Sequence, residues 1–116
     1  MKLLFHILRK NKRLEIDNET LPWGDITEKL DEEFSEVVVE IDNYRINKDF
    51  NSIVKIIKET FDLIQVCILI LWRCHKVAVK AESPDLIQEL NLEHKDKLIS
   101  IRHWEPVTGI EVDIKE

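Results

Sequence analysis

Apolar and polar positions along this chain repeat mainly with the period of helices. In the first half, apolar residues recur at i, i+4, i+7, i+8 and i+11, which is one stripe of an amphipathic helix: Leu30, Phe34, Val37, Val38 and Ile41. We expect this helix to begin after the sequence WGD (23–25), with Asp25 or Thr27 as its N-cap.

A second, longer helix is expected from about residue 49 to residue 80, after the connection NYRINKD (43–49). Its second half, DLIQVCILILW (62–72), is apolar nearly all round, which is typical of a helix buried on several sides. A chain of 116 residues has little else to cover those sides, so we expect another copy to contribute. The residues expected at that contact are Val66, Ile68, Leu69 or Trp72.

The third helix has a clear start, with Ser83 as N-cap and Pro84 at the first helical position, and is expected to run to about Trp104. Residues 2–16 fit either a β-hairpin around RKNKR (9–13) or a frayed helix. Residues 107–114, VTGIEVDI, alternate between apolar and polar, a pattern typical of an edge strand, which could pair with residues 2–8.

The predicted fold is therefore all-α: an antiparallel, oligomeric helical bundle with short β segments at both termini. One domain is expected, with an N-terminal segment (1–24), a helical core (25–104) and a C-terminal tail (105–116). The content of only two Gly and three Pro also favours long helices over a many-turned β fold.

Composition narrows the classes of partner. The formal net charge of −6 argues against binding to a nucleic-acid backbone, which needs clustered Lys and Arg. The longest apolar run, LIQVCILILW, has half the length of a membrane span, and the N-terminus does not read as a signal peptide. We therefore expect a cytoplasmic protein, in which Cys67 and Cys74 stay reduced.

Four carboxylates form two pairs at i, i+3 spacing: Glu33 with Glu36, and Glu59 with Asp62. Such pairs are neighbours on a helix, and a short connection makes the two helices antiparallel, so the pairs can face each other. Their charges would repel unless a cation lay between them, and oxygen-only ligands favour Mg²⁺ or Mn²⁺. The alternative from spacing alone is two solvated helix faces.

The sequence EEFSE (32–36), followed after 22 residues by ETFD (59–62), resembles the ExxE…ExxD signature of the all-α NTP pyrophosphohydrolases, the MazG-like superfamily. The resemblance covers about residues 25–80. It extends to HKDKLISIRHW (94–104), which is similar to the H..KL..RGW ending of small bacterial and phage-type members, with His103 where those usually have Gly.

This resemblance implies a MazG-like helical bundle and Mg²⁺-dependent hydrolysis of a nucleoside triphosphate to the monophosphate and pyrophosphate. By the same resemblance, the metal ligands would be Glu33, Glu36, Glu59 and Asp62. Either Glu32 or Glu36 would orient or deprotonate the attacking water. The physiological role implied is sanitising the nucleotide pool.

Basic and aromatic residues supply further candidates. Lys97 and Arg102 match the family's phosphate-contacting positions, although cations also complement a helix C-terminus. Lys55 is a third phosphate candidate, and salt bridging to the acidic residues beside it is the alternative. Trp23 could stack on a nucleobase or staple its loop to the core.

A rival function from another class is a catalytically silent helical protein whose acidic face serves interaction or regulation. Intact residues at all four ligand positions favour the enzyme. The partners expected are a nucleoside triphosphate and further copies of the chain, as a homodimer or homotetramer, with no nucleic acid and no membrane.

Overall fold

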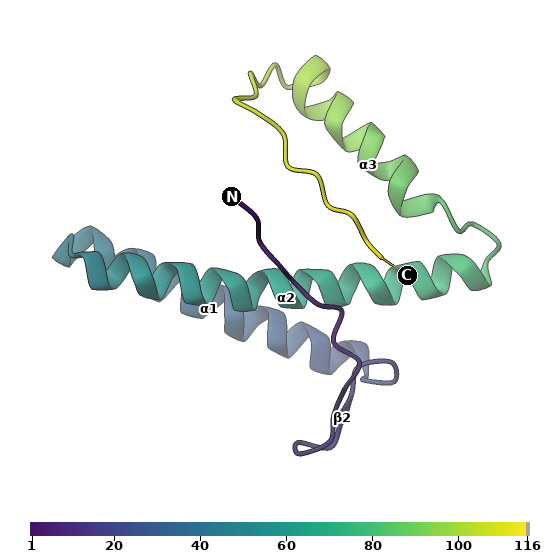
Figure 1. Cartoon of the computed structure of the whole chain (residues 1–116), viewed down its shortest axis with the longest axis horizontal. Coiled ribbons are helices and arrows are strands. Elements are labelled where there is room, and N and C mark those ends of the chain that lie inside the picture. The colour runs from purple at the N-terminus through teal and green to yellow at the C-terminus, as the bar shows by residue number, and fades with distance from the viewer. Residues whose placement is uncertain (116) are drawn as a thin grey trace. The chain divides into compact units, whose positions relative to one another are not determined.

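The computed structural model describes residues 1–115, which are mostly helical, in agreement with the all-α prediction (Figure 1). The described elements are two short strands, three α-helices and one π-helical turn: β1 (Lys10–Asn11), β2 (Ile16–Asp17), α1 (Trp23–Asn47), α2 (Phe50–Lys80), α3 (Leu86–Asp96) and η1 (Lys97–Ile101). They divide into two compact units, Met1–Val77 and a second unit that begins at Ala78. No helix within residues 1–115 is long and apolar enough to cross a membrane.

The N-terminal hairpin forms, with shorter strands than the sequence indicates. β1 and β2 are antiparallel, with Lys10 opposite Asp17 and Asn11 opposite Ile16. The turn therefore lies after RKN rather than around RKNKR, and Asn11 Oδ1 stabilises it by accepting a 3.0 Å hydrogen bond from Leu14 N–H. Neither residues 2–8 nor residues 107–114 form a strand in the described chain, so the predicted edge strand is wrong.

Helix α1 begins at Trp23, earlier than the predicted start after residue 25. Pro22 occupies the N-cap position, and its carbonyl accepts hydrogen bonds from Asp25 N–H (3.0 Å) and Ile26 N–H (3.2 Å), so the first turn already includes WGD. Neither predicted cap acts as one: Thr27 Oγ1 donates instead to the Trp23 carbonyl at 3.0 Å, and the described residues supply no side-chain cap.

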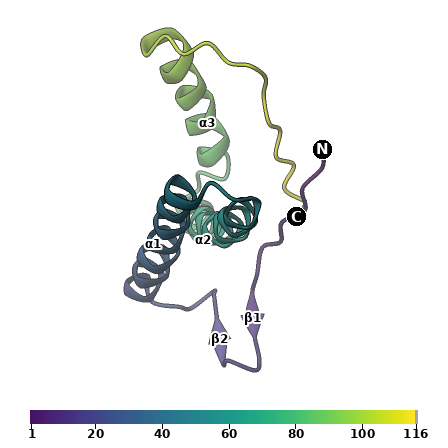
Figure 2. The ribbon, with the colours of Figure 1, turned by 90° about the vertical axis from the view of Figure 1, so that its left-hand side faces the viewer.

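The connection is shorter than the predicted 43–49, because α1 continues to Asn47, and its two residues place α1 and α2 antiparallel (Figures 1 and 2). Lys48 adopts a left-handed conformation (φ 49°), and its N–H donates to the Tyr44 carbonyl at 2.8 Å, which closes the end of α1. Asp49 then caps α2, because its Oδ1 accepts a 3.0 Å hydrogen bond from Ser52 N–H. Hydrogen bonds from the Ser52 side chain and backbone lower the pKa of Asp49 below its ordinary value of 3.8.

The rotation of α1 about its own axis differs from the one that the apolar stripe predicts. Ile26 is buried and Leu30 and Val37 are half-buried, but three stripe residues remain exposed: Phe34, Val38 and Ile41. The half-buried side of α1 instead carries the glutamates at one edge of the stripe, Glu33, Glu36 and Glu40. On α2, Leu69 is buried within the chain, whereas Val66, Ile68 and Trp72, the other residues expected at a subunit contact, are half-buried.

In the second unit, the third helix is shorter than predicted. Ser83 does not act as a side-chain cap; its carbonyl accepts a hydrogen bond from Leu86 N–H at 3.2 Å, and α3 starts at Leu86. After Asp96 the chain continues as η1, and His103 takes a left-handed conformation with φ 57°. Glycine adopts this conformation most readily, so the backbone at His103 suits the residue that the resemblance expects there.

Candidate metal centre

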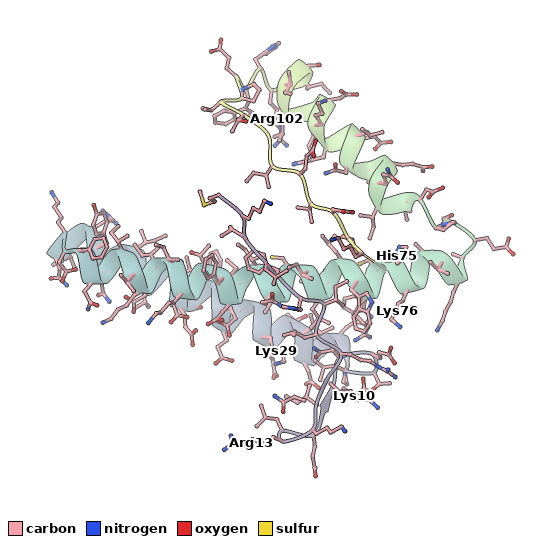
Figure 3. The ribbon with its side chains drawn as sticks, viewed as in Figure 1. Lys10, Arg13, Lys29, His75, Lys76 and Arg102 are labelled. Atoms are coloured by element: carbon pink, nitrogen blue, oxygen red, sulfur yellow. The ribbon has the colours of Figure 1, made fainter. Side chains whose placement is uncertain are left out.

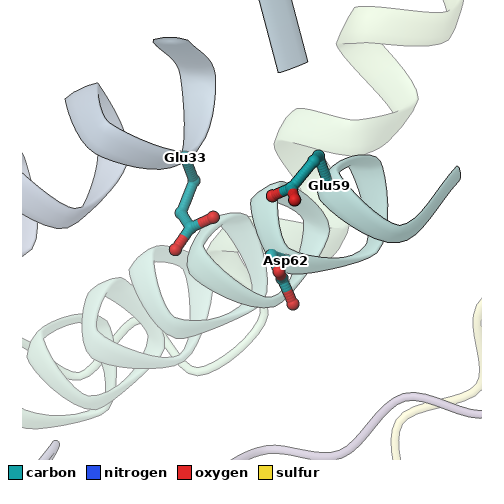
Figure 4. A group of neighbouring side chains, drawn as sticks. All are labelled: Glu33, Glu59 and Asp62. Atoms are coloured by element: carbon teal, nitrogen blue, oxygen red, sulfur yellow. The ribbon is translucent and has the colours of Figure 1, made fainter. Parts of the chain in front are cut away.

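Three carboxylates from the two long helices come together in the first unit. Glu33 projects from α1, and Glu59 and Asp62 project from α2 (Figure 4). Each offers one oxygen, and these oxygens all lie within 4.8 Å of one another. We call these three residues the carboxylate cluster.

Local helix geometry and the rotation of α1 together produce the cluster. Glu33, Glu36 and Glu40 follow one another at helical spacings of three and four, and all three are half-buried, so they lie on the side of α1 that packs against α2. Glu59 and Asp62 are one turn apart on α2, with Glu59 half-buried and Asp62 exposed. The cluster therefore has a covered side and an open side.

Three carboxylate oxygens at this interface lack a hydrogen-bond partner among the described residues. Oε2 of Glu33, Oε2 of Glu40 and Oε2 of Glu59 are hidden from solvent. A hidden acceptor without a partner is unfavourable, and a hidden carboxylate oxygen more so than a neutral one. A divalent cation is one species that would satisfy such oxygens.

Burial and neighbouring negative charges raise the pKa values of two residues of the carboxylate cluster, Glu33 and Glu59. Burial raises the pKa of Glu33 above its ordinary value of 4.5; a hydrogen bond with Glu36 lowers it, and the charges of Asp62, Glu32 and Glu59 raise it. A hydrogen bond with Glu36 is the largest cause that raises the pKa of Glu59, followed by burial and by the charges of Glu36, Asp62 and Glu40. Both carboxylates thus hold protons more tightly than free side chains do.

The remaining acidic candidates differ in how they interact with the carboxylate cluster. Glu36 interacts with both Glu33 and Glu59, although it is not one of the three convergent ligands. Glu32 is exposed, and its charge still raises the pKa of Glu33. Glu40 was not among the predicted site residues; the signal for it was its position seven residues after Glu33, on the same edge of α1.

The basic candidates belong to two different units. Lys55 is exposed on α2, one turn before Glu59. Lys97 and Arg102 lie in the second unit at the two ends of η1, where Arg102 N–H donates to the Lys97 carbonyl at 2.9 Å; Arg102 is labelled in Figure 3. The structure therefore links Lys97 with Arg102 and places Lys55 on the helix of the cluster.

The ring of Trp23 packs against the guanidinium of Arg73 and is not buried in the core. The Arg73 guanidinium lies 4.9 Å from the centroid of its ring, and Arg73 Nη1 also donates to the carbonyls of Asn18 (3.1 Å) and Leu21 (2.6 Å). Lys76, labelled in Figure 3, pairs with Glu19 at 3.2 Å. These contacts hold the segment before α1 against α2, and 46% of Trp23 stays exposed.

Comparison with known proteins adds no relative: no protein-family model, no curated protein and no solved structure matches this chain. The chemistry of the carboxylate cluster has to be inferred from its own residues.

Proposed function

We propose that the carboxylate cluster binds a divalent cation, Mg²⁺ or alternatively Mn²⁺, and that the protein hydrolyses a nucleoside triphosphate to the monophosphate and pyrophosphate. One observation carries the metal site: three carboxylate oxygens from two helices lie within 4.8 Å of one another, and two of the three residues also have a hidden oxygen without a partner. A merely solvated helix face would not hide its carboxylate oxygens.

The residues present fit such a cation. The donors are all carboxylate oxygens, which suit hard Mg²⁺ or Mn²⁺ better than zinc. Glu33, Glu59 and Asp62 would hold it, with Glu36 as a fourth ligand or as the partner that orients Glu33 and Glu59. Bound Mg²⁺ would neutralise phosphate charge and make a water more acidic.

A triphosphate is the substrate class that this site suits. Mg²⁺ commonly takes one or two carboxylates and completes its shell with water and phosphate oxygens, and the open side beside exposed Asp62 leaves room for such ligands. The chain carries a net charge of −6, so an anionic substrate needs a cation to approach the cluster. The order EEFSE…ETFD, which resembles the MazG-like signature, supports pyrophosphohydrolysis specifically.

In the proposed reaction, water attacks the α-phosphorus, the bond to the bridging oxygen breaks, and pyrophosphate leaves. Glu36 or Glu32 would hold and deprotonate the water; Glu36 is the half-buried one and contacts the cluster. Lys55 would meet the phosphates. Base stacking by Trp23 rests on its ring type and exposure alone, because Trp23 lies beside Arg73, about 21 Å along α2 from Glu59. The parts assigned to Lys97 and Arg102 rest on the resemblance alone.

The rival proposal, a helical interaction protein without activity, is favoured by the exposed apolar residues of α1 and α2. The deciding experiment incubates the full chain with canonical and modified NTPs and dNTPs in Mg²⁺, Mn²⁺ or chelator, and quantifies monophosphate and pyrophosphate. Equimolar release that requires metal supports the enzyme. Mg²⁺ binding without turnover on any substrate favours the interaction protein, and release of orthophosphate alone contradicts α-phosphorus attack.

A further inference from the structure

Charge is distributed unevenly along the chain. Residues 1–14 contain five of the 17 basic residues and none of the 23 acidic ones: Lys2, Arg9, Lys10, Lys12 and Arg13. They therefore carry a formal charge of +5, whereas the rest of the chain carries −11. A negatively charged partner is attracted to these residues and repelled by the remainder. We call residues 1–14 the basic segment.

The basic segment also exposes large aliphatic side chains. Six of them are each at least 41% exposed: Met1, Leu3, Leu4, Ile7, Leu8 and Leu14. Phe5 is half-buried instead, because its ring packs edge to face on Phe61 of α2, with 5.6 Å between the ring centroids. Cations and exposed aliphatic groups thus share one short stretch of chain, which is the combination found in segments that bind at a membrane interface.

Backbone hydrogen bonds hold the basic segment to the rest of the first unit. The His6 carbonyl accepts a hydrogen bond from Gln65 Nε2 at 2.9 Å. Asn18 donates twice, from Nδ2 to the Leu8 carbonyl at 2.9 Å and from its N–H to the Arg9 carbonyl at 2.8 Å. The segment is therefore presented by the folded unit, and its aliphatic side chains stay exposed although its backbone lies against α2 and the hairpin.

Most of the positive charge of the basic segment is not neutralised within the chain. Lys2, Lys12 and Arg13 form no ion pair with another residue among 1–115. Arg9 and Lys10 pair with carboxylates at 3.4 Å and 3.9 Å, and both cations stay more than half exposed. Exposed pairs of this kind are weak, so an external anion can compete for these two residues as well.

The hairpin carries part of this charge away from the helices. Its two strands project from α1 and α2 in both views, and Arg13 lies at the turn between them (Figures 1, 2 and 3). Lys12 precedes it in the turn, and Leu14 follows it with 63% of its surface exposed. The tip of the hairpin thus combines two cations with an exposed leucine.

An anionic lipid surface fits these features better than a nucleic acid does. Both attract clustered Lys and Arg. A lipid interface also takes up aliphatic side chains, whereas single-stranded nucleic acid stacks on exposed aromatic rings. Phe5 is the one Phe, Tyr or Trp of the basic segment, and Phe61 already covers it in part.

We propose that the basic segment attaches the protein to the surface of membranes that contain anionic lipids, with its cations at the lipid phosphates and its leucines in the interface. Attachment of this kind requires no helix that crosses the bilayer. It differs from the expectation that membranes are not partners, which considered spanning segments and a signal peptide. The negative charge of the other residues holds them away from the surface. This inference does not depend on the carboxylate cluster.

The test is co-sedimentation of the full chain with vesicles in about 0.1 M NaCl, where exposed charges still act over roughly 10 Å. One set of vesicles contains phosphatidylcholine alone, and the other includes about 30% phosphatidylserine. The wild type should bind the second set at least ~10-fold more than the first, and about 1 M NaCl should release it. Sedimentation with neither set, or equally with both, would overturn the proposal.

Two double variants test the two kinds of contact separately. Lys12→Glu with Arg13→Glu should lower the bound fraction at least ~5-fold, because the tip of the hairpin then repels phosphatidylserine. Leu4→Ser with Leu14→Ser, at leucines that are 82% and 63% exposed, should lower it by a similar factor, since stable anchoring takes both charge and apolar contact. Binding by either variant at the wild-type level would overturn the proposal.

Matched control variants lie outside the basic segment. Lys80→Glu with Lys95→Glu makes the same change of net charge at exposed positions, and Ile110→Ser with Val112→Ser alters aliphatic side chains that are 92% and 80% exposed. Both should bind like the wild type, and an equal loss in either would overturn the proposal. A labelled single-stranded oligonucleotide that binds the wild type when phosphatidylserine vesicles do not would assign the basic segment to nucleic acid instead.

Discussion

Glu59 is the residue of the carboxylate cluster at which charge repulsion is most direct. It comes from α2, one of its oxygens is hidden, and Glu36, Asp62 and Glu40 all act to raise its pKa. Like charges held this close weaken the fold unless protons or a cation intervene. Substitution of Glu59 can distinguish relief of this repulsion by protons from relief by a cation.

Glu59→Gln keeps size and removes one charge. We expect the chelator-treated variant to melt at the same temperature as wild type or higher, because repulsion is relieved. It should gain less on addition of Mg²⁺, since a ligand stabilises in proportion to its affinity for the folded state. Pyrophosphate release should fall by at least ~10²-fold.

Glu28→Gln is the matched control, an exposed glutamate of the same region that lies outside the cluster. It should melt and turn over like wild type in both buffers. If Glu59→Gln and wild type gain equally from Mg²⁺, the carboxylate cluster is no metal site.

The pH dependence of stability should differ between the metal-free and the Mg²⁺-bound protein. The pKa values of Glu33 and Glu59 are raised above 4.5 in the fold, so the folded state binds protons more tightly than the unfolded state. In chelator these two groups should add stability as the pH falls from 7 through their raised pKa values toward 4.5. Excess Mg²⁺ should remove this gain, because it competes with the protons.

Asp49 affects the stability of the fold in a separate, lower pH range. Its pKa lies below 3.8, so its stabilising effect is present above that pH and is lost only as the pH falls through the lowered value. Urea unfolding between pH 7 and 4.5, with and without Mg²⁺, isolates the cluster. A metal-free stability that declines steadily over that range would contradict the crowding of Glu33 and Glu59.

At the scale of the elements, the connection between α1 and α2 determines which residues can face each other. Only Lys48 and Asp49 separate the helices. Lys48 ends α1 in a left-handed conformation, and Asp49 starts α2 by capping Ser52 N–H. A longer or looser connection would weaken the alignment of Glu33 with Glu59 and Asp62.

Lys48→Gly should stabilise the protein by up to about 1 kcal/mol, because glycine adopts φ near 49° without the strain of a Cβ. Lys58→Gly, an exposed position inside α2, should instead destabilise it by about 1 kcal/mol. The change in stability is measured as the shift of the urea unfolding midpoint of each variant from that of the wild type, at equal m-value. The same loss from both substitutions would contradict the left-handed turn.

At the scale of the whole molecule, the described chain has few buried apolar residues. Within residues 1–115 these are Ile26, Leu69 and Ala78. A domain of this length normally draws its stability from a larger core. If a second copy covers the exposed apolar residues of α1 and α2, folding and association become coupled.

The melting temperature should then rise with protein concentration, since dilution favours separated chains. We expect Ile57→Glu to abolish this dependence and Glu28→Gln, a change at an exposed polar position, to retain it. Calorimetry across a hundredfold concentration range provides the measurement. A melting temperature that is constant over that range would indicate a fold that does not depend on association.

Local features of the sequence determined the helices and their order. Helical spacing, the expected connection at residues 43–49, the helix start at Ser83 and Pro84 and the scarcity of Gly predict three helices, because these preferences act within a few residues. The i, i+3 carboxylate pairs follow from the same period. Errors of local prediction fall at the ends, at Trp23 and at Asp96, where competing hydrogen bonds of similar strength decide the boundary.

Only the tertiary structure decided how α1 is rotated about its axis. Glu33 lies at the edge of an apolar stripe, and the spacing permits either the stripe or its edge to face α2. Packing brought the edge inward, which placed Glu33 beside Glu59 and Asp62, hid an oxygen of Glu40 and left Phe34 exposed. Rotation depends on what the neighbouring surface accepts, and that surface comes from residues distant in the chain or from another copy.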